Sequence, residues 1–208
     1  YSSTGYLVAL EQVRISSGGS VLYNKPADGC NVTTGSCGSE WKLVNGPSNS
    51  FDITAGNSIT IEASASTSYG YSSGVAGAFI DFNNDKDFND AGEYLGTWTV
   101  PCSGTNTPAA LASRTFNIPC NITPSATRLR VVMNYQYENM TPGHGCSSCS
   151  GGPANYGESE DYSINLVLPT SVSANFVAPS TAFVKTVVNF INSNQKGYTE
   201  HAWDANND

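Results

Sequence analysis

Alternation of apolar and polar residues over 127–136 is the feature that most restricts the fold of this chain. Four apolar side chains fall on one face of this segment: Leu129, Val131, Met133 and Tyr135. The opposite face carries Arg128, Arg130, Val132 and Asn134. A period of two residues is that of a β-strand. No segment shows a convincing helical period of 3.6 residues, so the pattern predicts an all-β protein.

Shorter alternating segments recur along the chain, separated by turn residues. They are expected at 6–15, 51–53, 59–63, 76–82, 94–100, 116–118 and 162–166, whereas 24–47 is expected to be a long loop with some pairing of its own. About nine or ten short strands predict an antiparallel β-sandwich, jelly-roll-like, over residues 1–168. After a linker at Pro169–Ser171, residues 172–208 have a weaker three-strand pattern, which is expected to be a second, partial β domain.

Charge and hydropathy argue against a nucleic-acid partner and against a membrane span. Lys and Arg number 9 against 17 Asp and Glu, a net charge of -8, so the chain cannot neutralise a phosphate backbone and no nucleic acid is expected. No apolar run approaches the roughly 20 residues of a membrane-spanning helix, so no membrane span is expected. The chain opens at Tyr1 without a signal-like segment, as expected of a processed protein or an excised piece.

The segment 79–93 joins an apolar strand to a dense run of oxygen-bearing side chains. These are Asp81, Asn83, Asp85, Asp87, Asp90 and Glu93. Carboxylates this close together repel one another unless a cation lies among them. The spacing predicts a Ca²⁺ site, because Ca²⁺ takes six to eight oxygen ligands; an acidic turn exposed to solvent is the alternative. The loop differs from an EF-hand because Lys86 and Gly92 stand where that loop has Gly and Glu.

Six cysteines in loop-like surroundings predict disulfides and therefore an oxidising compartment. Local pairing would join Cys30 to Cys37, Cys102 to Cys120, and Cys146 to Cys149, although six cysteines allow fifteen connectivities. The last pair has the spacing of a redox motif, but its Gly- and Pro-rich flanks favour a structural disulfide. The spacing of the six does not fit a four-ligand zinc site.

Three segments in fixed order resemble one protein family. Residues 78–93 follow its pattern of aromatic-Ile-Asp-aromatic-Asn-x-Asp with a closing Gly-Glu, except that Lys86 replaces Gly. Residues 127–131 match its Arg-x-Arg-Val strand, and 157–162 match its signature segment, with Ser159 in place of Val. By these motifs, residues 1–168 resemble the GEVED domain of bacterial secreted and cell-surface proteins. The resemblance implies a β-sandwich accessory module and assigns no ligand.

The last part of the chain resembles a different family. Asn175-Phe176 and Trp203-Asp204 are similar to the first part of a PKD-type immunoglobulin-like domain, over residues 172–208. Such pairs of domains occur in long multidomain surface proteins, adhesins and secreted hydrolases, typically of Bacteroidota. The resemblance implies that the parent protein acts at the cell surface or outside the cell.

Acidic residues at the start of the last strand have two interpretations. Glu158, Glu160 and Asp161 either supply further cation ligands, or Glu160 pairs with Arg128 or Arg130 on a neighbouring strand. The pairing is favoured, because an acidic side chain that enters a central strand needs a partner.

No arrangement of residues in the sequence indicates catalysis. No nucleophile-base arrangement stands out and no phosphate loop precedes a helix, so we expect no enzymatic activity. The expected function is that of a calcium-stabilised module of a surface protein, adhesin or filament, whose partners are neighbouring domains or subunits. A carbohydrate-binding module beside a secreted hydrolase is the alternative, with glycans as partners. Its stacking platforms would come from Tyr69, Tyr71, Tyr135, Tyr137 and Tyr156.

Overall fold

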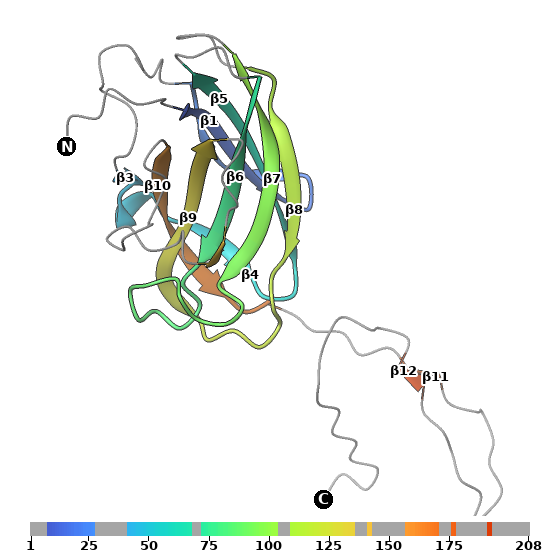
Figure 1. The fold of residues 1–208 in the computed structure, drawn as a ribbon. Coiled ribbons are helices and arrows are strands. Elements are labelled where there is room, and N and C mark those ends of the chain that lie inside the picture. Colours follow the sequence, from blue (N-terminus) through green and yellow to red (C-terminus); the bar gives the residue numbers. More distant parts are fainter. Residues whose placement is uncertain are drawn as a thin grey trace, which may run out of the picture.

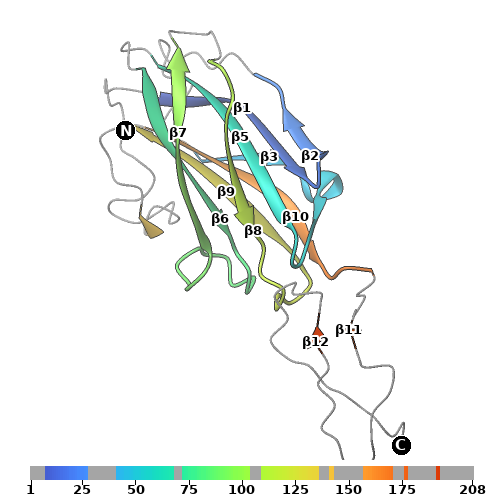
Figure 2. The same cartoon turned by 90° about the vertical axis from the view of Figure 1, so that its right-hand side faces the viewer.

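A computed structural model describes residues 8–27, 41–67, 72–103, 109–135, 141–142, 157–170, 176–177 and 191–192. Within these ranges the regular structure is β-strand, apart from one 3-10 turn, η1 (Pro47–Asn49). Two layers of strands face each other, as two views at right angles show (Figure 1, Figure 2). The predicted all-β sandwich is confirmed. No helix in the described ranges is long and apolar enough to cross a membrane.

The first layer has four antiparallel strands in the order β2-β1-β5-β8. Their bounds are β1 Val8–Ser17, β2 Ser20–Lys25, β5 Ser58–Thr67 and β8 Ala112–Asn117. A two-residue turn, Gly18-Gly19, joins β1 to β2, and both glycines have positive φ, 56° and 82°. Turns of this kind match the twist of a β-hairpin, and glycine adopts them without steric cost.

The second layer is built around β9 and β10. Its strands are β3 Trp41–Asn45, β4 Phe51–Thr54, β6 Ser73–Ile80, β7 Tyr94–Ser103, β9 Ser125–Tyr135 and β10 Glu158–Val167. The order is β7-β6-β9-β10, with β3 and β4 both parallel to β10 along its far edge. The end of β7 also pairs with β5 through Cys102 and Ser103, and this pairing joins the two layers at one corner.

The core fills the space between the layers. The predicted inward face of β9 is confirmed, because Leu129, Val131 and Met133 are fully buried in that core. A smaller apolar cluster of Phe79, Phe88 and Val132 lies outside the main core and covers the other face of the second layer. β10 and residues 129–134 of β9 are therefore buried on both faces, so the charged side chains within them need partners.

Two strands form in segments that have no clear strand pattern in the sequence. β2 follows the predicted turn at 16–19, and β3 forms inside the segment 24–47 that was expected to be mainly loop. In the expected second domain the structure describes two pairs of residues, β11 (Phe176–Val177) and β12 (Ile191–Asn192), which pair antiparallel. The rest of the predicted PKD-type domain lies outside the described residues.

One predicted disulfide is wrong. No disulfide joins Cys102 to Cys120. Cys102 pairs with Ala65 on β5, whereas Cys120 Sγ lies against Gly56, nine residues earlier. Nine residues of strand span about 30 Å, far more than the roughly 7 Å between Cα atoms that a disulfide allows. β8 separates the two cysteines because it runs along most of β5. The predicted pairs Cys30–Cys37 and Cys146–Cys149 lie outside the described residues.

Candidate functional site

The acidic loop, residues 81–93, connects β6 to β7 at one end of the sandwich (Figure 1). Backbone hydrogen bonds fix both ends of this loop: Ile80 N–H donates to Glu93 O at 2.9 Å, and Asp81 N–H donates to Arg128 O at 3.2 Å. The Thr127 hydroxyl also donates to Asp81 O at 2.7 Å. The loop therefore starts from a position set by β9.

Side-chain oxygens hold the path of the acidic loop. Asp85 N–H donates to Asn83 Oδ1 at 3.0 Å, Asp87 N–H to Asp85 Oδ1 at 3.1 Å, and Asn89 N–H to Asp87 Oδ1 at 2.9 Å. Lys86 has a φ of 84°, in the left-handed region that favours glycine. Lys86 thus adopts a backbone conformation that is usual for glycine.

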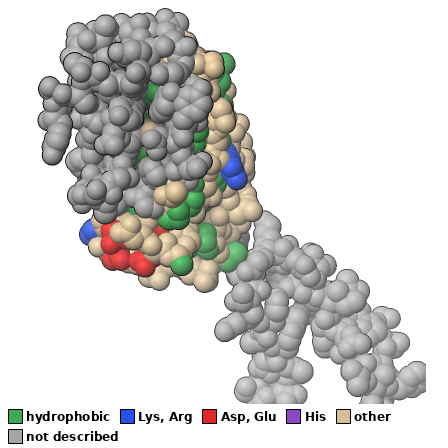
Figure 3. Space-filling view, viewed as in Figure 1, with side chains coloured by type: hydrophobic (Ala, Val, Ile, Leu, Met, Phe, Trp, Pro, Cys, Tyr) green, Lys and Arg blue, Asp and Glu red, His purple; other side chains and the backbone are tan. Residues whose placement is uncertain are grey.

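Three of the predicted metal ligands come together. Oxygens of Asp85, Asp87 and Asp90 lie within 4.8 Å of one another, and all three side chains are exposed. Acidic side chains gather at this end of the molecule (Figure 3). Asn83 Nδ2 donates to Asp85 Oδ2 at 3.0 Å and to Asp90 Oδ2 at 2.5 Å. The Asp87 N–H, followed by the Asn83 amide, holds the pKa of Asp85 below its ordinary value, so this carboxylate stays ionised.

Of the other three predicted ligands, Asn83 is exposed, whereas Asp81 and Glu93 lie deeper and are each 2% exposed. Asp81 Oδ2 accepts the Lys86 N–H at 3.2 Å, whereas the buried Asp81 Oδ1 has no hydrogen-bond donor. Glu93 Oε1 accepts the Phe82 N–H at 2.9 Å and Glu93 Oε2 accepts the Asp90 N–H at 3.4 Å. Burial raises the pKa of Glu93 above its ordinary value. Glu93 therefore closes the loop and lies outside the exposed group of three.

The acidic residues of β10 separate onto two faces. Glu160 points between the layers, where its Oε1 lies 2.6 Å from Lys25 Nζ and its Oε2 accepts the Tyr162 hydroxyl at 2.5 Å. Glu158 also points inward, and its Oε2 accepts the Leu10 N–H at 2.9 Å. Lys25 Nζ donates to Leu10 O at 3.0 Å, so Lys25 and Glu158 both bind the backbone of Leu10 on β1.

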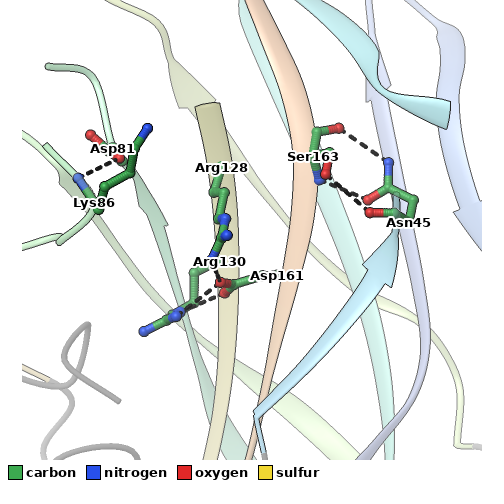
Figure 4. Close-up of polar contacts among 7 residues, drawn as sticks. All are labelled: Asn45, Asp81, Lys86, Arg128, Arg130, Asp161 and Ser163. Carbon is green, nitrogen blue, oxygen red and sulfur yellow. Dashed lines mark hydrogen bonds and ion pairs between the residues drawn. The ribbon is translucent and has the colours of Figure 1, made fainter. Parts of the chain in front are cut away.

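Asp161 binds the arginines that were predicted as partners of Glu160. Arg130 Nε and Nη2 donate to its two carboxylate oxygens at 2.5 and 2.9 Å, and Arg128 Nη1 lies 3.4 Å from Oδ2 (Figure 4). The predicted Glu160–Arg pairing is therefore wrong. Side chains alternate along a strand, so Glu160 and Asp161 point to opposite faces, and the register places Arg130 opposite Asp161.

Arg130 also connects β10 to the acidic loop. Its guanidinium lies 4.5 Å from the centroid of the Phe88 ring, and Phe88 belongs to that loop. A cation over an aromatic face is attracted to it, more so where water is excluded, and Arg130 is only 5% exposed. Contacts from Asp161 to Arg130 and from Arg130 to Phe88 thus connect β10 to the acidic loop.

A hollow of about 340 Å³ lies beside this group, on the outer face of the second layer. The acidic loop forms one wall, and Leu43 of β3 and Pro47 of η1 belong to the other. Figure 4 shows Asp81 and Lys86 on one side of Arg128 and Arg130, and Asn45 and Ser163 on the other. On the edge side, Asn45 and Ser163 are joined by hydrogen bonds at 2.7, 3.0 and 3.1 Å. This hollow and the role of Asn45 were not predicted from the sequence, because both depend on the parallel pairing of β3 with β10. The alternating arginines of β9 were its one local signal.

Four of the five predicted tyrosine platforms lie outside the described residues: Tyr69, Tyr71, Tyr137 and Tyr156. Tyr135 ends β9, but its side chain is not among those that the structure describes. The sugar-stacking role of these residues stays a prediction.

Residues 75–165 match the family model of the GEVED domain. This match contains the acidic loop, the arginines of β9 and the signature segment of β10, the three motifs on which the resemblance rests. It is narrower than the expected range 1–168, although β1 to β5 belong to the same sandwich as the matched strands. No curated protein matches the sequence.

Similar solved structures include two of the same CARDB domain from Pyrococcus furiosus. One is a crystal structure of that domain in complex with di-metal ions, which has 11% identity and a TM-score of 0.34 and covers 79% of this chain and 94% of that chain. The other is a solution NMR structure, which has 11% identity and a TM-score of 0.32 and covers 78% and 94%.

Proposed function

We propose that this protein is a non-catalytic, calcium-stabilised β-sandwich module of a secreted or cell-surface protein, acting in an adhesin or surface filament. The observation that carries the proposal is the acidic loop. There, oxygens of the exposed Asp85, Asp87 and Asp90 lie within 4.8 Å of one another, and the buried Asp81 Oδ1 of the same loop has no hydrogen-bond donor. A buried polar atom without a partner is costly, and a bound cation would satisfy it.

The donor set fits a hard cation. Asp85, Asp87 and Asp90 would hold the ion, with Asn83 and Asp81 as further oxygen donors, and Ca²⁺ accepts such mixed oxygen ligands with water completing its shell. The ion would remove the repulsion among the three carboxylates. It would thereby stiffen the loop, which contacts β9 through Asp81 and lies against Arg130 through Phe88.

Thermal unfolding in the presence of calcium tests this role. A ligand that binds only the folded state adds about 2.7 kcal/mol at a hundredfold excess over its Kd, and so raises the midpoint by roughly 5 to 11 °C. Asp85→Asn with Asp87→Asn should abolish the rise. Asp52→Asn is the matched control, because Asp52 is an exposed carboxylate on β4, outside the acidic loop. This variant should keep the calcium-dependent rise in the midpoint. A wild-type midpoint that neither calcium nor a chelator moves would rule out the calcium role.

The non-catalytic role rests on how the buried carboxylates are used. Each of them binds a group that holds the fold together. Glu160 lies against the Lys25 ammonium, Asp161 binds the Arg130 guanidinium, and Glu93 accepts the Phe82 N–H. We therefore expect no turnover of glycan or peptide substrates by the full chain. Hydrolysis of either class, abolished by substitution of one of these residues, would contradict the proposal.

The surface role also includes residues 172–208, proposed as the start of a PKD-type domain that contacts neighbouring domains or subunits. A chain that ends at Leu168 should stay folded and monomeric and keep its calcium response, which melting and light scattering would check. Failure of residues 1–168 to fold alone would place the domain boundary elsewhere.

A carbohydrate-binding module beside a secreted hydrolase is the second candidate. The observation that favours it is the hollow, whose lining combines hydroxyl, amide and apolar groups, among them Ser163, Asn165 and Pro47. Such mixed linings suit small polar ligands, and 340 Å³ lies at the lower end of the usual size of ligand sites.

A further inference from the structure

The hollow presents accessible positive charge, although the whole chain carries a net charge of -8. Lys86 is exposed, and the Arg128 side chain is 48% exposed; both line the hollow. Arg130 lies beneath them at 5% exposure, with its charge balanced by the bidentate bond to Asp161. Asp81 is the acidic residue among those that line the hollow, and it is 2% exposed; the exposed Asp85 and Asp87 flank Lys86 in the sequence.

An exposed guanidinium beside an ammonium group favours one kind of ligand. Arginine binds a carboxylate through two parallel hydrogen bonds, and such charge-assisted bonds are about twice as strong as neutral ones. Arg128 and Lys86 are the exposed charged residues among those that line the hollow, so a ligand meets them first, although Arg128 Nη1 also lies 3.4 Å from Asp161 Oδ2. The hollow therefore selects for an anionic group.

The opposite wall carries groups that suit sugar hydroxyls. Asn165 Nδ2 donates to Ser50 Oγ at 3.1 Å, and the Ser163 hydroxyl donates to Asn45 O at 3.0 Å, so each serine oxygen keeps acceptor capacity. Leu43, 38% exposed, and Pro47 add apolar surface against which the C–H face of a sugar ring can pack. A peptide added as a strand would instead need an open sheet edge, whereas the hollow lies on a sheet face.

We propose that this hollow binds an acidic sugar residue, with the sugar carboxylate on Arg128 and Lys86 and the hydroxyls on Ser50, Ser163 and Asn165. The inference rests on the proposed extracellular, calcium-stabilised module and names its ligand. Asn84 and Lys86 line the hollow and also belong to the acidic loop, where both have positive φ, 61° and 84°. Calcium in the loop fixes this wall and so strengthens sugar binding.

Titration calorimetry of the full chain with tri-galacturonate tests the proposal, with neutral tri-galactose and a Glu-rich peptide as comparisons. At low ionic strength, where exposed charges are least screened, we expect binding of the uronate alone. Arg128→Gln should weaken binding at least about tenfold, as loss of a charge-assisted pair requires. Arg114→Gln is the matched control, because Arg114 is exposed on β8 in the other layer, and it should leave the affinity unchanged.

A second variant keeps the test independent of Arg128 and of its contact with Asp161. Leu43→Glu adds a negative charge at the exposed rim and should also weaken uronate binding, while its melting midpoint stays near that of the wild type. Equal binding of the neutral sugar, binding of the peptide instead, no uronate binding, or insensitivity to Arg128→Gln would each overturn the proposal.

Calcium and chelator arms separate the two proposals. A calcium-dependent rise in the melting midpoint without uronate binding would overturn the sugar site alone. Uronate binding that calcium leaves unchanged, in a protein whose midpoint calcium does not shift, would overturn the calcium role alone. Uronate affinity that rises with calcium supports both.

Discussion

Replacement of Lys25 by Met should destabilise the sandwich far more than loss of an exposed ion pair. Lys25 is 5% exposed and Glu160 is fully buried, and their charged atoms lie 2.6 Å apart between the two layers. Lys25→Met keeps most of the apolar stem but removes the cation. Glu160 then keeps the Tyr162 hydroxyl as a donor but has lost the positive charge beside it.

The expected loss follows from the asymmetry of buried pairs. Removal of one partner of such a pair costs about 3–5 kcal/mol, because the other charge stays buried without compensation. For a domain of this size, each kcal/mol moves the melting midpoint by about 2–4 °C, so a fall of roughly 6–20 °C is expected. The loss of the bond from Lys25 Nζ to Leu10 O acts in the same direction.

Two further variants decide whether the pairing is the cause. Lys25→Met combined with Glu160→Gln should recover much of the loss, because the double variant buries no unpaired charge. Arg14→Met breaks another cross-strand pair, Arg14 with Glu62, in which the arginine is 39% exposed, and should cost less than about 1 kcal/mol. Urea unfolding would measure all three. A loss for Lys25→Met no larger than for Arg14→Met, or a double variant no more stable than Lys25→Met, would refute the reasoning.

Two other predictions concern the acidic loop and the thiol on β7. Lys86→Gly and Lys86→Gln should both tighten calcium binding, because each removes a positive charge. Only Lys86→Gly should also stabilise the calcium-free protein, by about 1 kcal/mol, because a φ of 84° strains a residue that has a Cβ. Equal melting midpoints for the two calcium-free variants would contradict this prediction. Burial raises the pKa of Cys102 from 9.0 to about 12. Iodoacetamide should therefore label Cys102 much more slowly in the native than in the denatured protein between pH 7 and 9. Above about pH 9 only the unfolded chain releases this proton, so the Cys102 contribution to stability should fall as pH rises toward 12; equally fast native labelling would contradict the shift.

Local patterns in the sequence predicted part of this architecture. The alternation over 127–136 identified β9, and the run of oxygen-bearing side chains after Ile80 identified the acidic loop, since each pattern depends on neighbours in sequence. β3 was harder to predict because it exists through its parallel pairing with β10, more than a hundred residues later. The hollow depends on that same pairing, and the alternating arginines of β9 are its one local signal in the sequence.

Errors of partner choice have the same physical origin. Glu160 and Asp161 are adjacent in sequence, yet strand alternation separates their partners onto two faces of one layer. Cys102 and Cys120 are close in sequence, yet β8 carries the chain along most of β5 between them. In both cases the sequence identified residues that needed explanation, and the register of the sheet decided what each one contacts.

The alternation within β10 also explains how one short segment can organise two separate parts of the molecule. Glu158 and Glu160 face inward and bind β1 and β2, so they hold the two layers together. Asp161 faces outward and orients Arg130, which lies over Phe88 of the acidic loop. An ion bound in that loop would therefore act on a side chain already anchored in the sheet. The bound ion would stiffen one wall of the hollow and leave the core unchanged. A stable surface module with a ligand site at one end needs this separation between its core and its site.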